Sequence, residues 1–590
     1  MQWHLHNTGQ SGGTPGVDIR APEAWQITTG DPNIVVAVLD SGVDTTHPDL
    51  VDNLVPGYDF WDGDDDAYPA LDHPINTHGT NCAGLIGAQG NDDIGVSGVL
   101  WNCKILPLRI AGVRANGTQY RITYADAATA IRWAASQGAA VLSNSWDWGQ
   151  TNEIWHSAVV DVTMPGGLGR KGSGCLFFTA SGNTGGVVLP QAAYPEVICV
   201  GGTDHNDVRC SYSSYGSQLD LVAPTGVGLT WDDVTRTKGL GWLWTTDIVG
   251  LPGWTPHPQN PFSDLPDYFA VMGGTSGACP IAAGVAALIL SVEPNLTSDE
   301  VRHFLERSAK DLGDPGRDNY YGWGRVDARA ALDVVLAYRC DLNHDWKVDE
   351  QDLAILNAAI DANDLSADIA PAAKRDGIVD ANDLELLTRY LGTIIPEMSL
   401  IAHWKLDETE GTIVHDSAGE HHDATIMGAP LWQPEGGMVG GALQLSGVPN
   451  FATAKVVRNP SEGPLSVFAW VKGGGPGQVV ISQQGGANWL MANAADGALK
   501  TELKSPGGQS STLTSGSVIT DGNWHRIGFT WDGSNRVLYV DDIEVARDTQ
   551  ADLAGSTKDL SIGTGSSLAP ATFWNGLIDD VRIYDRAVKP

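Results

Sequence analysis

The first 338 residues alternate short apolar runs with longer stretches of helical periodicity. The apolar runs cover residues 34–39, 140–142, 175–180 and 197–200, and the helical stretches cover 125–137 and 281–291. Parallel strands are covered on both faces, so they appear in a sequence as uninterrupted apolar runs. Strands that alternate with helices predict βαβ units. We therefore expect an α/β domain with a parallel sheet over residues 1–338.

The pattern changes twice after residue 338. Between 339 and 396, two Asp-rich loops each precede a helical stretch, at 353–360 and 384–391, which predicts a small α module. From 397 to 590, strands separated by Gly, Asn and Asp turns replace the helical signal, as at 465–471, 525–531 and 536–540. The chain is therefore expected to be multidomain, ending in an all-β sandwich or jelly roll.

Composition narrows the class of protein. The 590-residue chain carries 71 acidic against 35 basic residues, a formal charge of −36, which argues against nucleic-acid binding. Low charge content and 71 glycines suit an extracellular, loop-rich protein. Clustered Asp residues in turns are typical of Ca²⁺ ligands, and simple solubility is the alternative.

The sequence gives weaker indications of membrane insertion, processing and cysteine pairing. No apolar run approaches the roughly 18–20 residues of a membrane span. The chain opens like a mature domain, so we expect a leader and propeptide to have been removed. The seven cysteines match neither a disulfide framework nor a zinc pattern, and at least one is unpaired within the chain. Cys82 and Cys279 are predicted to be small buried packing residues.

Three segments place a polar residue at the end of an apolar element. Asp40 follows the run 34–39, His78 opens a helix of small residues, and Ser276 lies where a glycine turn enters the 281–291 helix. A Ser hydroxyl is a poor nucleophile until a base accepts its proton. His78 would be that base, and Asp40 would hold its tautomer and stabilise the imidazolium.

These segments resemble the motifs of the subtilase (subtilisin-like) family. They are Asp-Ser-Gly at 40–42, His-Gly-Thr at 78–80 and Gly-Thr-Ser-Gly-Ala-Cys-Pro at 274–280, in the family's order. The resemblance covers about residues 1–338. It implies a subtilisin-like fold and a serine endopeptidase that acts on protein or peptide substrates. Gly277 stands where the family usually has Met, which weakens conclusions about specificity and leaves the nucleophile in place.

The resemblance also implies an oxyanion donor and a substrate-binding strand. Asn183, beside Gly182, would donate its side-chain amide together with the Ser276 backbone N–H. The segment expected to pair with extended substrate contains Ser145, Trp146 and Asp147. Asp147 either favours a basic substrate side chain or faces solvent. Residues 225–270 look like an insertion that forms a structured rim loop.

Two calcium sites are implied in the same domain. The first is an acidic loop whose near-alternating carboxylates are Asp59, Asp62, Asp64 and Asp66. Several subtilases carry a Ca²⁺ loop at this place, and a solvated acidic loop is the alternative. The second would join Asp49 to Asp92, with the family's N-terminal ligand expected upstream of Met1.

Residues 339–396 contain a loop with EF-hand-like ligand spacing. Its ligands would be Asp341, Asn343, Asp345, the Lys347 carbonyl, Asp349 and Asp352. Asp at the twelfth position followed by one helix resembles a dockerin repeat, although Trp346 replaces the usual Gly. A second repeat retains Asp376, Asp380 and Asp383, and Asp368 joins it if the loop is longer. The module is either a cohesin-binding dockerin or a Ca²⁺-stabilised spacer, and we favour the spacer.

Stretches beginning at residues 402, 440, 524 and 576 resemble laminin-G-like, concanavalin-like jelly rolls of secreted and surface proteins. Such domains bind glycans or proteins, or only pack. Trp432, Trp489 and Trp574 would either stack on sugar or belong to the core. We expect a secreted or cell-surface Ca²⁺-stabilised endopeptidase with C-terminal attachment modules. A binding scaffold on the same fold, or a transpeptidase that uses the same acyl-enzyme, are the alternatives.

Overall fold

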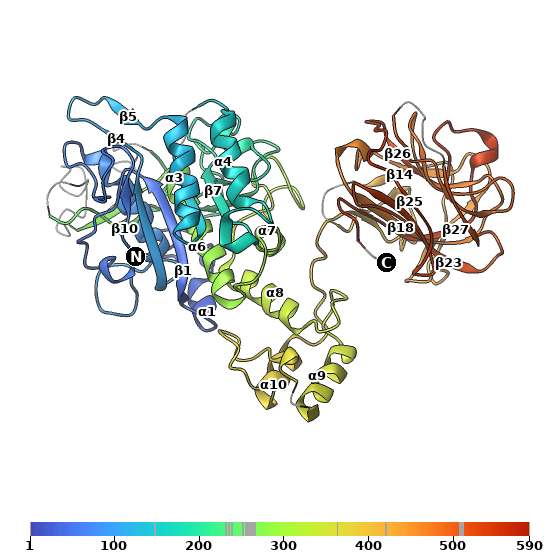
Figure 1. The fold of residues 1–590 in the computed structure, drawn as a ribbon, viewed down its shortest axis with the longest axis horizontal. Coiled ribbons are helices and arrows are strands. Elements are labelled where there is room, and N and C mark those ends of the chain that lie inside the picture. The colour runs from blue at the N-terminus through green and yellow to red at the C-terminus, as the bar shows by residue number, and fades with distance from the viewer. Residues whose placement is uncertain are drawn as a thin grey trace. The chain divides into compact units, whose positions relative to one another are not determined.

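The computed structural model describes residues 2–146, 149–229, 233, 237, 240–250, 253, 267–362, 364–418, 422–506 and 512–588. The chain divides into two compact units, Met1–Pro396 and Glu397–Pro590, coloured blue to yellow and orange to red in Figure 1. Residues 339–396 belong to the first unit. Their separation from residues 1–338 as a domain of their own therefore stays a prediction.

A parallel seven-stranded sheet forms the centre of the first unit, as predicted. Its order is β2-β3-β1-β6-β7-β8-β9. The strands are β1 (Gly30–Asp40), β2 (Tyr58–Asp59), β3 (Asn102–Arg109), β6 (Ala139–Asn144), β7 (Leu176–Ala180), β8 (Ile198–Thr203) and β9 (Leu221–Pro224). The first apolar run forms β1, which has strands on both sides. Residues at the carboxyl end of β1 therefore lie near the middle of the edge where the parallel strands end.

Helices cover both faces of this sheet. They are α1 (Ala21–Trp25), α2 (His78–Gly87), α3 (Tyr124–Ser136), α4 (Glu153–Thr163), α6 (Thr275–Val292), α7 (Ser298–Arg307) and α8 (Ala328–Cys340). Val36 and Val38 of β1 join the core that holds α2, α6 and α8, while Ala37 and Leu39 join the core under α3 and α4. Figure 1 shows α3 and α4 side by side. Because successive residues of a strand point to opposite faces of the sheet, β1 contributes side chains to both cores.

Helix α6 is almost entirely buried in the first unit. Of its eighteen residues, Ser276 alone is not buried. By length and composition α6 could cross a membrane, so the expectation that no apolar run reaches that length was wrong for this helix. However, 94% of it is buried inside the protein, which is typical of a core helix.

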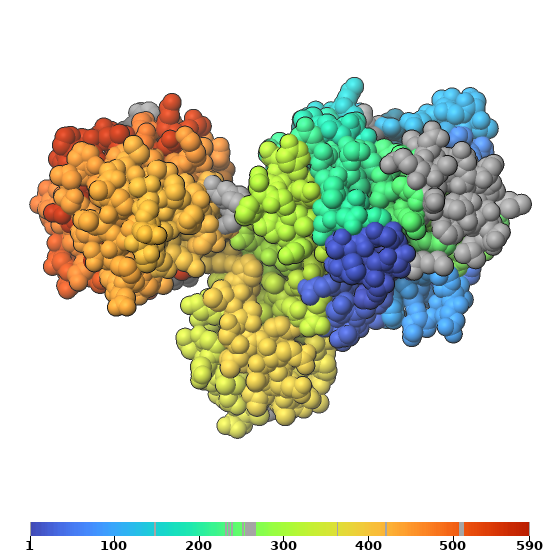
Figure 2. All heavy atoms as spheres, turned by 180° about the vertical axis from the view of Figure 1, so that it is seen from behind, coloured from blue at the N-terminus to red at the C-terminus, as the bar shows by residue number. Residues whose placement is uncertain are grey.

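The segment 339–396 extends the same core. Its helices, α9 (Glu350–Ala362) and α10 (Ala381–Tyr390), lie where helical stretches were predicted. Leu356 and Leu387 are fully buried in the cluster that also contains Leu332 of α8. In Figure 2 the segment is the yellow lobe below the lime-coloured surface.

The second unit is an antiparallel sandwich, which confirms the all-β prediction. Its two sheets run β15-β16-β27-β18-β23-β24-β25, with β12 also on β27, and β13-β14-β17-β26-β19-β20-β21-β22. The first sheet contains β12 (Leu400–Trp404), β15 (Leu431–Gln433), β16 (Ala442–Ser446), β18 (Leu465–Gly473), β23 (Trp524–Trp531), β24 (Asn535–Val540), β25 (Ile543–Thr549) and β27 (Asn575–Tyr584). The second contains β13 (Ile413–Val414), β14 (Ala424–Met427), β17 (Phe451–Ala454), β19 (Val479–Gln483), β20 (Asn488–Ala492), β21 (Ala498–Thr501), β22 (Leu513–Val518) and β26 (Leu560–Ile562).

Trp489 and Trp574 lie fully buried in the core of the sandwich. Neither ring is therefore available for stacking on a sugar. Trp432 is partly buried, and its indole nitrogen donates to the Gly411 carbonyl at 3.1 Å. Of the three aromatic candidates, only Trp432 keeps an accessible ring.

Two smaller antiparallel ribbons lie beside the large sheet. The strands β4 (Ala111–Val113) and β5 (Gln119–Arg121) form one, and β10 (Leu243–Thr246) and β11 (Tyr268–Met272) form the other. The second ribbon falls in and beside the predicted insertion and lies against α2. Thr245 and Thr246 donate from their hydroxyls to the carbonyls of Asn81 and Thr80, at 2.6 and 2.7 Å.

The contact between β10 and α2 leaves room only for glycine at position 84. A Cβ on Gly84 would lie 2.2 Å from Thr246 Oγ1. We therefore expect Gly84→Ala to lower the free energy of unfolding of the first unit by about 1–3 kcal/mol, through overpacking. Denaturant titration would measure this. The matched control is Gly186→Ala, whose added carbon meets only Thr184 Oγ1, at 3.3 Å. Equal stability of the two variants would contradict the proposed packing.

Candidate active site

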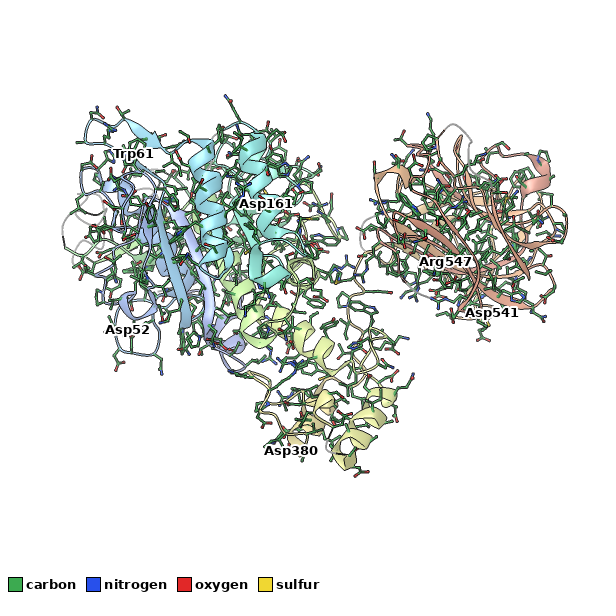
Figure 3. All side chains as sticks on the ribbon, viewed as in Figure 1. Asp52, Trp61, Asp161, Asp380, Asp541 and Arg547 are labelled. Atoms are coloured by element: carbon green, nitrogen blue, oxygen red, sulfur yellow. The ribbon has the colours of Figure 1, made fainter. Side chains whose placement is uncertain are left out.

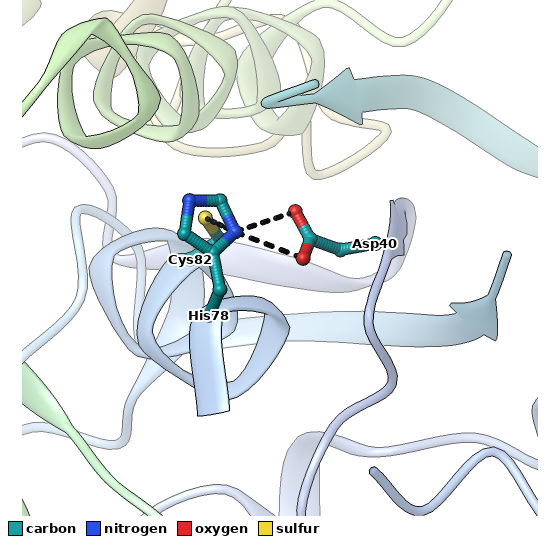
Figure 4. Close-up of side chains that lie close together, drawn as sticks. All are labelled: Asp40, His78 and Cys82. Carbon is teal, nitrogen blue, oxygen red and sulfur yellow. Dashed lines mark hydrogen bonds and ion pairs between the residues drawn. The ribbon is translucent and has the colours of Figure 1, made fainter. Parts of the chain in front are cut away.

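Buried Asp40 and partly buried His78 form a hydrogen-bonded pair at the end of a strand and the start of a helix. Asp40 is the last residue of β1, and His78 is the first residue of α2. His78 Nδ1 lies 2.9 Å from Oδ1 and 3.0 Å from Oδ2 of Asp40 (Figure 4). The carboxylate is 5% exposed. Because a carboxylate only accepts, this contact assigns a proton to Nδ1 and leaves Nε2 as the acceptor of the neutral ring.

Ser276 lies in the same pocket as His78. The pocket is also lined by Asn183 and by apolar side chains of the β10–β11 region. Ser276 Oγ donates to the Ser145 carbonyl at 3.2 Å, and Ser145 Oγ donates to the Ser276 carbonyl at 3.0 Å. Within the described residues, Ser276 Oγ makes no hydrogen bond to His78. Such contacts often form only when substrate is bound, so the triad stays a prediction.

Asn183 is held with its amide oxygen engaged. Oδ1 accepts from the Thr275 backbone N–H at 2.8 Å and from its hydroxyl at 3.0 Å. This fixes the orientation of the side chain and leaves the Nδ2 donors for a ligand in the pocket. Gly274 approaches closely, because a Cβ there would lie 3.2 Å from Asn183 Nδ2. The predicted oxyanion donor is thus preorganised by the residue before Ser276.

The other predicted substrate residues have structural partners. The Gly182 N–H donates to Thr275 Oγ1 at 3.3 Å. The indole nitrogen of Trp146 donates to the Leu39 carbonyl at 2.5 Å, and the ring packs on the core under α3 and α4. Asp147 lies outside the described residues. Of this predicted set, Ser145 is the one whose atoms contact Ser276 directly.

Gly277, the departure from the family pattern, has a packing explanation. A Cβ at this position would lie 2.8 Å from Leu243 Cδ1. Leu243 belongs to β10, so the ribbon occupies the space of the missing side chain. Sequence analysis did not identify the pocket residues Leu229, Trp242, Phe269, Val271 and Met272. The apolar run at 269–272 was the available signal for them.

Charge at the site determines the protonation of His78. Burial alone would lower the pKa of His78, but the neighbouring Asp40 charge outweighs it and raises that pKa well above its ordinary value of 6.5. Cys82 Sγ lies 3.9 Å from Nδ1 and 3.6 Å from the Ser276 carbonyl. Burial raises the pKa of the Cys82 thiol, so it stays uncharged.

Asp40, His78 and Cys82 also form the one trio of His, Cys, Asp or Glu ligand atoms within 4.8 Å of one another among the described residues (Figure 4). Asp40 and His78 already satisfy one another, and the thiol keeps its proton. We therefore interpret Cys82 as a packing residue beside the pair. Cys82 and Cys279 are both buried free thiols, as predicted.

The first predicted calcium loop contains a guanidinium instead of free carboxylates. Arg109 pairs with Asp59 and, at 2.8 Å, with Asp62. Asp64 and Asp66 accept backbone N–H groups within their own loop. A metal ion at Asp59 or Asp62 would have to displace Arg109, and the calcium assignment of this loop stays a prediction.

The second predicted site has unpartnered carboxylate oxygens. Asp49 is fully buried; Oδ2 accepts from the Val96 N–H at 2.9 Å, while Oδ1 has no partner among the described residues. Asp92 Oδ2 is likewise buried and unpartnered among them. Burial, together with the Asp92 charge, raises the pKa of Asp49 to about 7. These atoms fit a cation.

Gln2 reaches the same loop, which sequence analysis missed. Its side chain donates to the Ser97 carbonyl at 2.6 Å and accepts from the Ser97 N–H at 2.9 Å. The N-terminal segment is therefore hydrogen-bonded to this loop, and a ligand upstream of Met1 stays a prediction. No local pattern links positions 2 and 97, so only the fold could identify this contact.

The two Asp-rich loops of 339–396 share one arrangement. Asp352 accepts from the N–H groups of Leu342, Asn343 and Asp349. Asp383 accepts in the same way from Ile369, Ala370 and Asp380. The corresponding donors, the N–H groups of Leu342 and Ile369, therefore align position 341 with position 368. The second loop is longer than the first.

The equivalence of Asp341 and Asp368 extends to the sixth position of the shorter loop. Asp341 Oδ2 accepts from the Trp346 N–H at 2.8 Å, and Asp368 Oδ2 accepts from the Gly377 N–H at 2.8 Å. Trp346 and Gly377 both have left-handed φ, 67° and 81°. Asp368 Oδ1 is buried without a partner among the described residues, so this oxygen fits a cation.

Comparison with known proteins gives two family matches. Residues 31–324 match the model described as "Subtilase family", and residues 447–590 match the "Concanavalin A-like lectin/glucanases superfamily". The calcium-dependent protease of Trichormus variabilis is 34% identical over 360 residues, 57% of this chain and 51% of that protein. The halolysin-like extracellular serine protease of Natrialba magadii is 32% identical over 315 residues, 52% of this chain and 49% of that protein.

Thermitase of Thermoactinomyces vulgaris is 31% identical over 315 residues. The match covers 53% of this chain and 93% of thermitase. The chain thus spans about half the length of the first two relatives and nearly the whole of the third.

The Asp40–His78 pair yields a direct test of its electrostatics. In Asp40→Asn, burial of the ring remains and the opposing charge is lost, so the pKa of His78 should fall below its wild-type value. NMR titration of the imidazole would follow this change. Asp52→Asn, at an exposed carboxylate labelled in Figure 3, is the control and should leave that pKa unchanged. An unshifted pKa in Asp40→Asn would refute the assigned cause.

Proposed function

Because this chain belongs to the subtilase family, we propose that it is a serine endopeptidase that uses Asp40, His78 and Ser276. The observation that carries this proposal is the Asp40–His78 hydrogen bond at 2.9 Å, in a pocket that also contains Ser276 and Asn183. A buried carboxylate on one ring nitrogen leaves the other nitrogen to act on a hydroxyl. This arrangement supports acyl transfer.

The proposed reaction begins when Ser276 Oγ turns from the Ser145 carbonyl to Nε2 of His78. His78 takes the hydroxyl proton as Oγ attacks the substrate carbonyl carbon, and Asp40 stabilises the imidazolium. The tetrahedral oxyanion accepts hydrogen bonds from Asn183 Nδ2 and the Ser276 N–H. His78 then donates its proton to the leaving amine, and the peptide C–N bond breaks. Water, deprotonated by His78, hydrolyses the ester and restores Ser276.

The charge on Asp40 sets the pH range of this reaction. Only neutral His78 can accept a proton, and its pKa is raised by Asp40. Activity should therefore be low at acidic pH and increase as the pH rises through that pKa. The carboxylate that stabilises the imidazolium in the transition state thus also confines activity to higher pH.

We propose that the pocket wall beside Ser276 selects an apolar substrate side chain. Trp242, Phe269, Val271 and Met272 line it together with Leu229. Backbone pairing with an extended peptide is sequence-tolerant, so such a pocket would supply most of the discrimination. Gly277 and Leu243 lie next to this wall and shape it.

Calcium is proposed as a structural ion in the first unit. Asp49 and Asp92 would hold one ion near Gln2, and the loops at 341–352 and 368–383 would hold others in a dockerin-like module. Relatives named calcium-dependent proteases support this assignment. A bound ion would neutralise buried carboxylates and hold the loops, and it takes no part in the chemical step.

The remaining proposals concern location and attachment. A relative named an extracellular protease supports secretion. The match of residues 447–590 to a lectin-like superfamily supports attachment of the second unit to a glycan or another surface. The segment 339–396 shares its core with α8, which favours a stabilising spacer over an independent cohesin-binding module.

Removal of the nucleophile tests the proposed activity. Ser276→Ala should lower kcat on a fluorogenic peptide library by about 10⁶-fold, the scale known for a subtilisin triad, because no oxygen remains to form the ester. Asn183→Ala should lower kcat by about 10²–10³-fold through loss of one oxyanion donor. Ser136→Ala, at an exposed hydroxyl on α3, is the control. A scaffold without turnover would show no Ser276-dependent cleavage and no labelling by a fluorophosphonate.

Chelation tests the ion at Asp49. A site filled at 100 times its Kd contributes about 2.7 kcal/mol, so EDTA should lower the Tm of the first unit by several degrees. Calorimetry on the Ser276→Ala protein avoids autolysis. Asp49→Asn should lose part of this response, whereas Asp52→Asn should keep it. If EDTA shifts Asp49→Asn and the Ser276→Ala parent equally, calcium does not bind at Asp49.

A further inference from the structure

The hydroxyl group of Tyr212 lies buried between two main-chain segments beside the candidate site. Tyr212, in the loop that follows β8, is 8% exposed. Its hydroxyl donates to the Gly226 carbonyl and accepts from the Gly274 N–H at 3.1 Å. Burial raises the pKa of Tyr212 well above its ordinary value of 10.0, so the hydroxyl keeps the proton that it donates. Because Gly274 lies two residues before Ser276, this hydroxyl contacts the turn that leads to the nucleophile.

Gly274 is held at both of its polar backbone groups. Its φ of 76° is left-handed, and it precedes α6 without a side chain that could cap the helix. Its carbonyl accepts from Thr225 Oγ1 at 2.6 Å and from the Gly277 N–H at 3.0 Å. The Tyr212 hydroxyl holds the N–H on the other side. Glycine is conformationally permissive, so the shape of this turn depends on these partners.

The segment around Tyr212 also holds the loop that carries Asn183. The Tyr212 carbonyl accepts from the Gly185 N–H at 2.7 Å. The Ser214 N–H donates to the Gly182 carbonyl at 2.9 Å. This segment therefore bonds to the main chain before and after Asn183. One short stretch of chain thus connects the loop of the oxyanion donor with the turn before the nucleophile.

Asn183 and that turn also meet directly. The Thr275 N–H donates to Asn183 Oδ1 at 2.8 Å, and a Cβ on Gly274 would lie 3.2 Å from Asn183 Nδ2. The N–H groups of Gly274 and Thr275 are consecutive in the chain, and they donate to Tyr212 and Asn183 respectively. A change in the backbone of Gly274 would therefore displace the N–H group that orients Asn183.

We propose that Tyr212 is a positioning residue for the oxyanion donors. Through its hydroxyl and its carbonyl, it fixes the place of the Asn183 amide relative to the Ser276 N–H. A donor stabilises the transition state most when it is preorganised, because it then needs no reorganisation while the charge develops. Tyr212 acts through these groups and not on the substrate itself. The inference rests on the proposed function.

The kinetics of Tyr212→Phe test this role, because the phenyl ring keeps the packing and only the hydroxyl is lost. On a fluorogenic peptide, kcat should fall about tenfold while KM stays within about twofold, since the donors bind the oxyanion only in the transition state. In an Asn183→Ala background, the same substitution should change kcat by less than about twofold, because the donor that it positions is already absent.

Tyr390→Phe is the matched control. Tyr390, in α10, is 7% exposed, and its hydroxyl donates to Asp333 Oδ1 in α8 at 2.9 Å. Loss of this buried hydroxyl should lower the Tm, as loss of the Tyr212 hydroxyl does, and leave kcat unchanged. An unchanged kcat in Tyr212→Phe would overturn the inference. So would a fall in kcat that persists in the Asn183→Ala background, since the hydroxyl would then support the fold and not the donor.

A measurement without substrate separates this inference from the proposed function. Hydrogen exchange in residues 273–277 would be followed by mass spectrometry in the Ser276→Ala protein, with and without Tyr212→Phe. Exchange should be at least about tenfold faster in the double variant, because the Gly274 N–H loses its acceptor. Equal exchange would overturn the inference and leave the protease proposal standing. Cleavage by the parent that does not depend on Ser276 would instead refute the proposed function, and the positioning role with it.

Discussion

The candidate site depends on one partly buried contact, the hydrogen bond between Asp40 and His78. It forms because the central strand β1 ends opposite the first turn of α2, and the approach is very close. A Cβ on Gly79 would lie 2.2 Å from the Gly42 carbonyl oxygen and 3.0 Å from Asp40 Cβ. Ser41 completes the junction, since its Oγ accepts from the Gly79 N–H and donates to the Asn76 carbonyl. The glycine after His78 is therefore a steric requirement of the pair.

Helix α6 and the β10–β11 ribbon support the site around Asp40 and His78. Helix α6 is buried along its whole length except at Ser276, which lines the pocket. The β10–β11 ribbon is hydrogen-bonded to α2 through Thr245 and Thr246, and Leu243 fills the space beside Gly277. A segment that looks like an insertion thus supports the helix that carries His78 and lines the pocket that contains Ser276.

In this strongly acidic chain, the carboxylates described here have three different kinds of surroundings. Asp59 is neutralised by Arg109. Asp352 and Asp383 are satisfied by backbone N–H groups of their own loops. Asp49 and Asp579 each keep a buried oxygen without a partner among the described residues. The density of acidic residues in the sequence does not distinguish these cases, because what separates them is the identity of the group that faces each oxygen.

The sequence by itself determined the class of fold and the candidate triad. Runs such as 34–39 predict buried parallel strands because burial on both faces is a local property of a strand, and Asp40, His78 and Ser276 stand at recognisable ends of such elements. Only the tertiary structure decided that Arg109 pairs with Asp59 and that Gln2 reaches Ser97. It also decided that Asp368 takes the place of Asp341 in the second loop, and that Trp489 and Trp574 are buried. These outcomes rest on contacts between positions far apart in the chain, or on a loop of unequal length. Hydrophobic periodicity records which face of an element is buried, and it carries no information about which distant side chain meets that face.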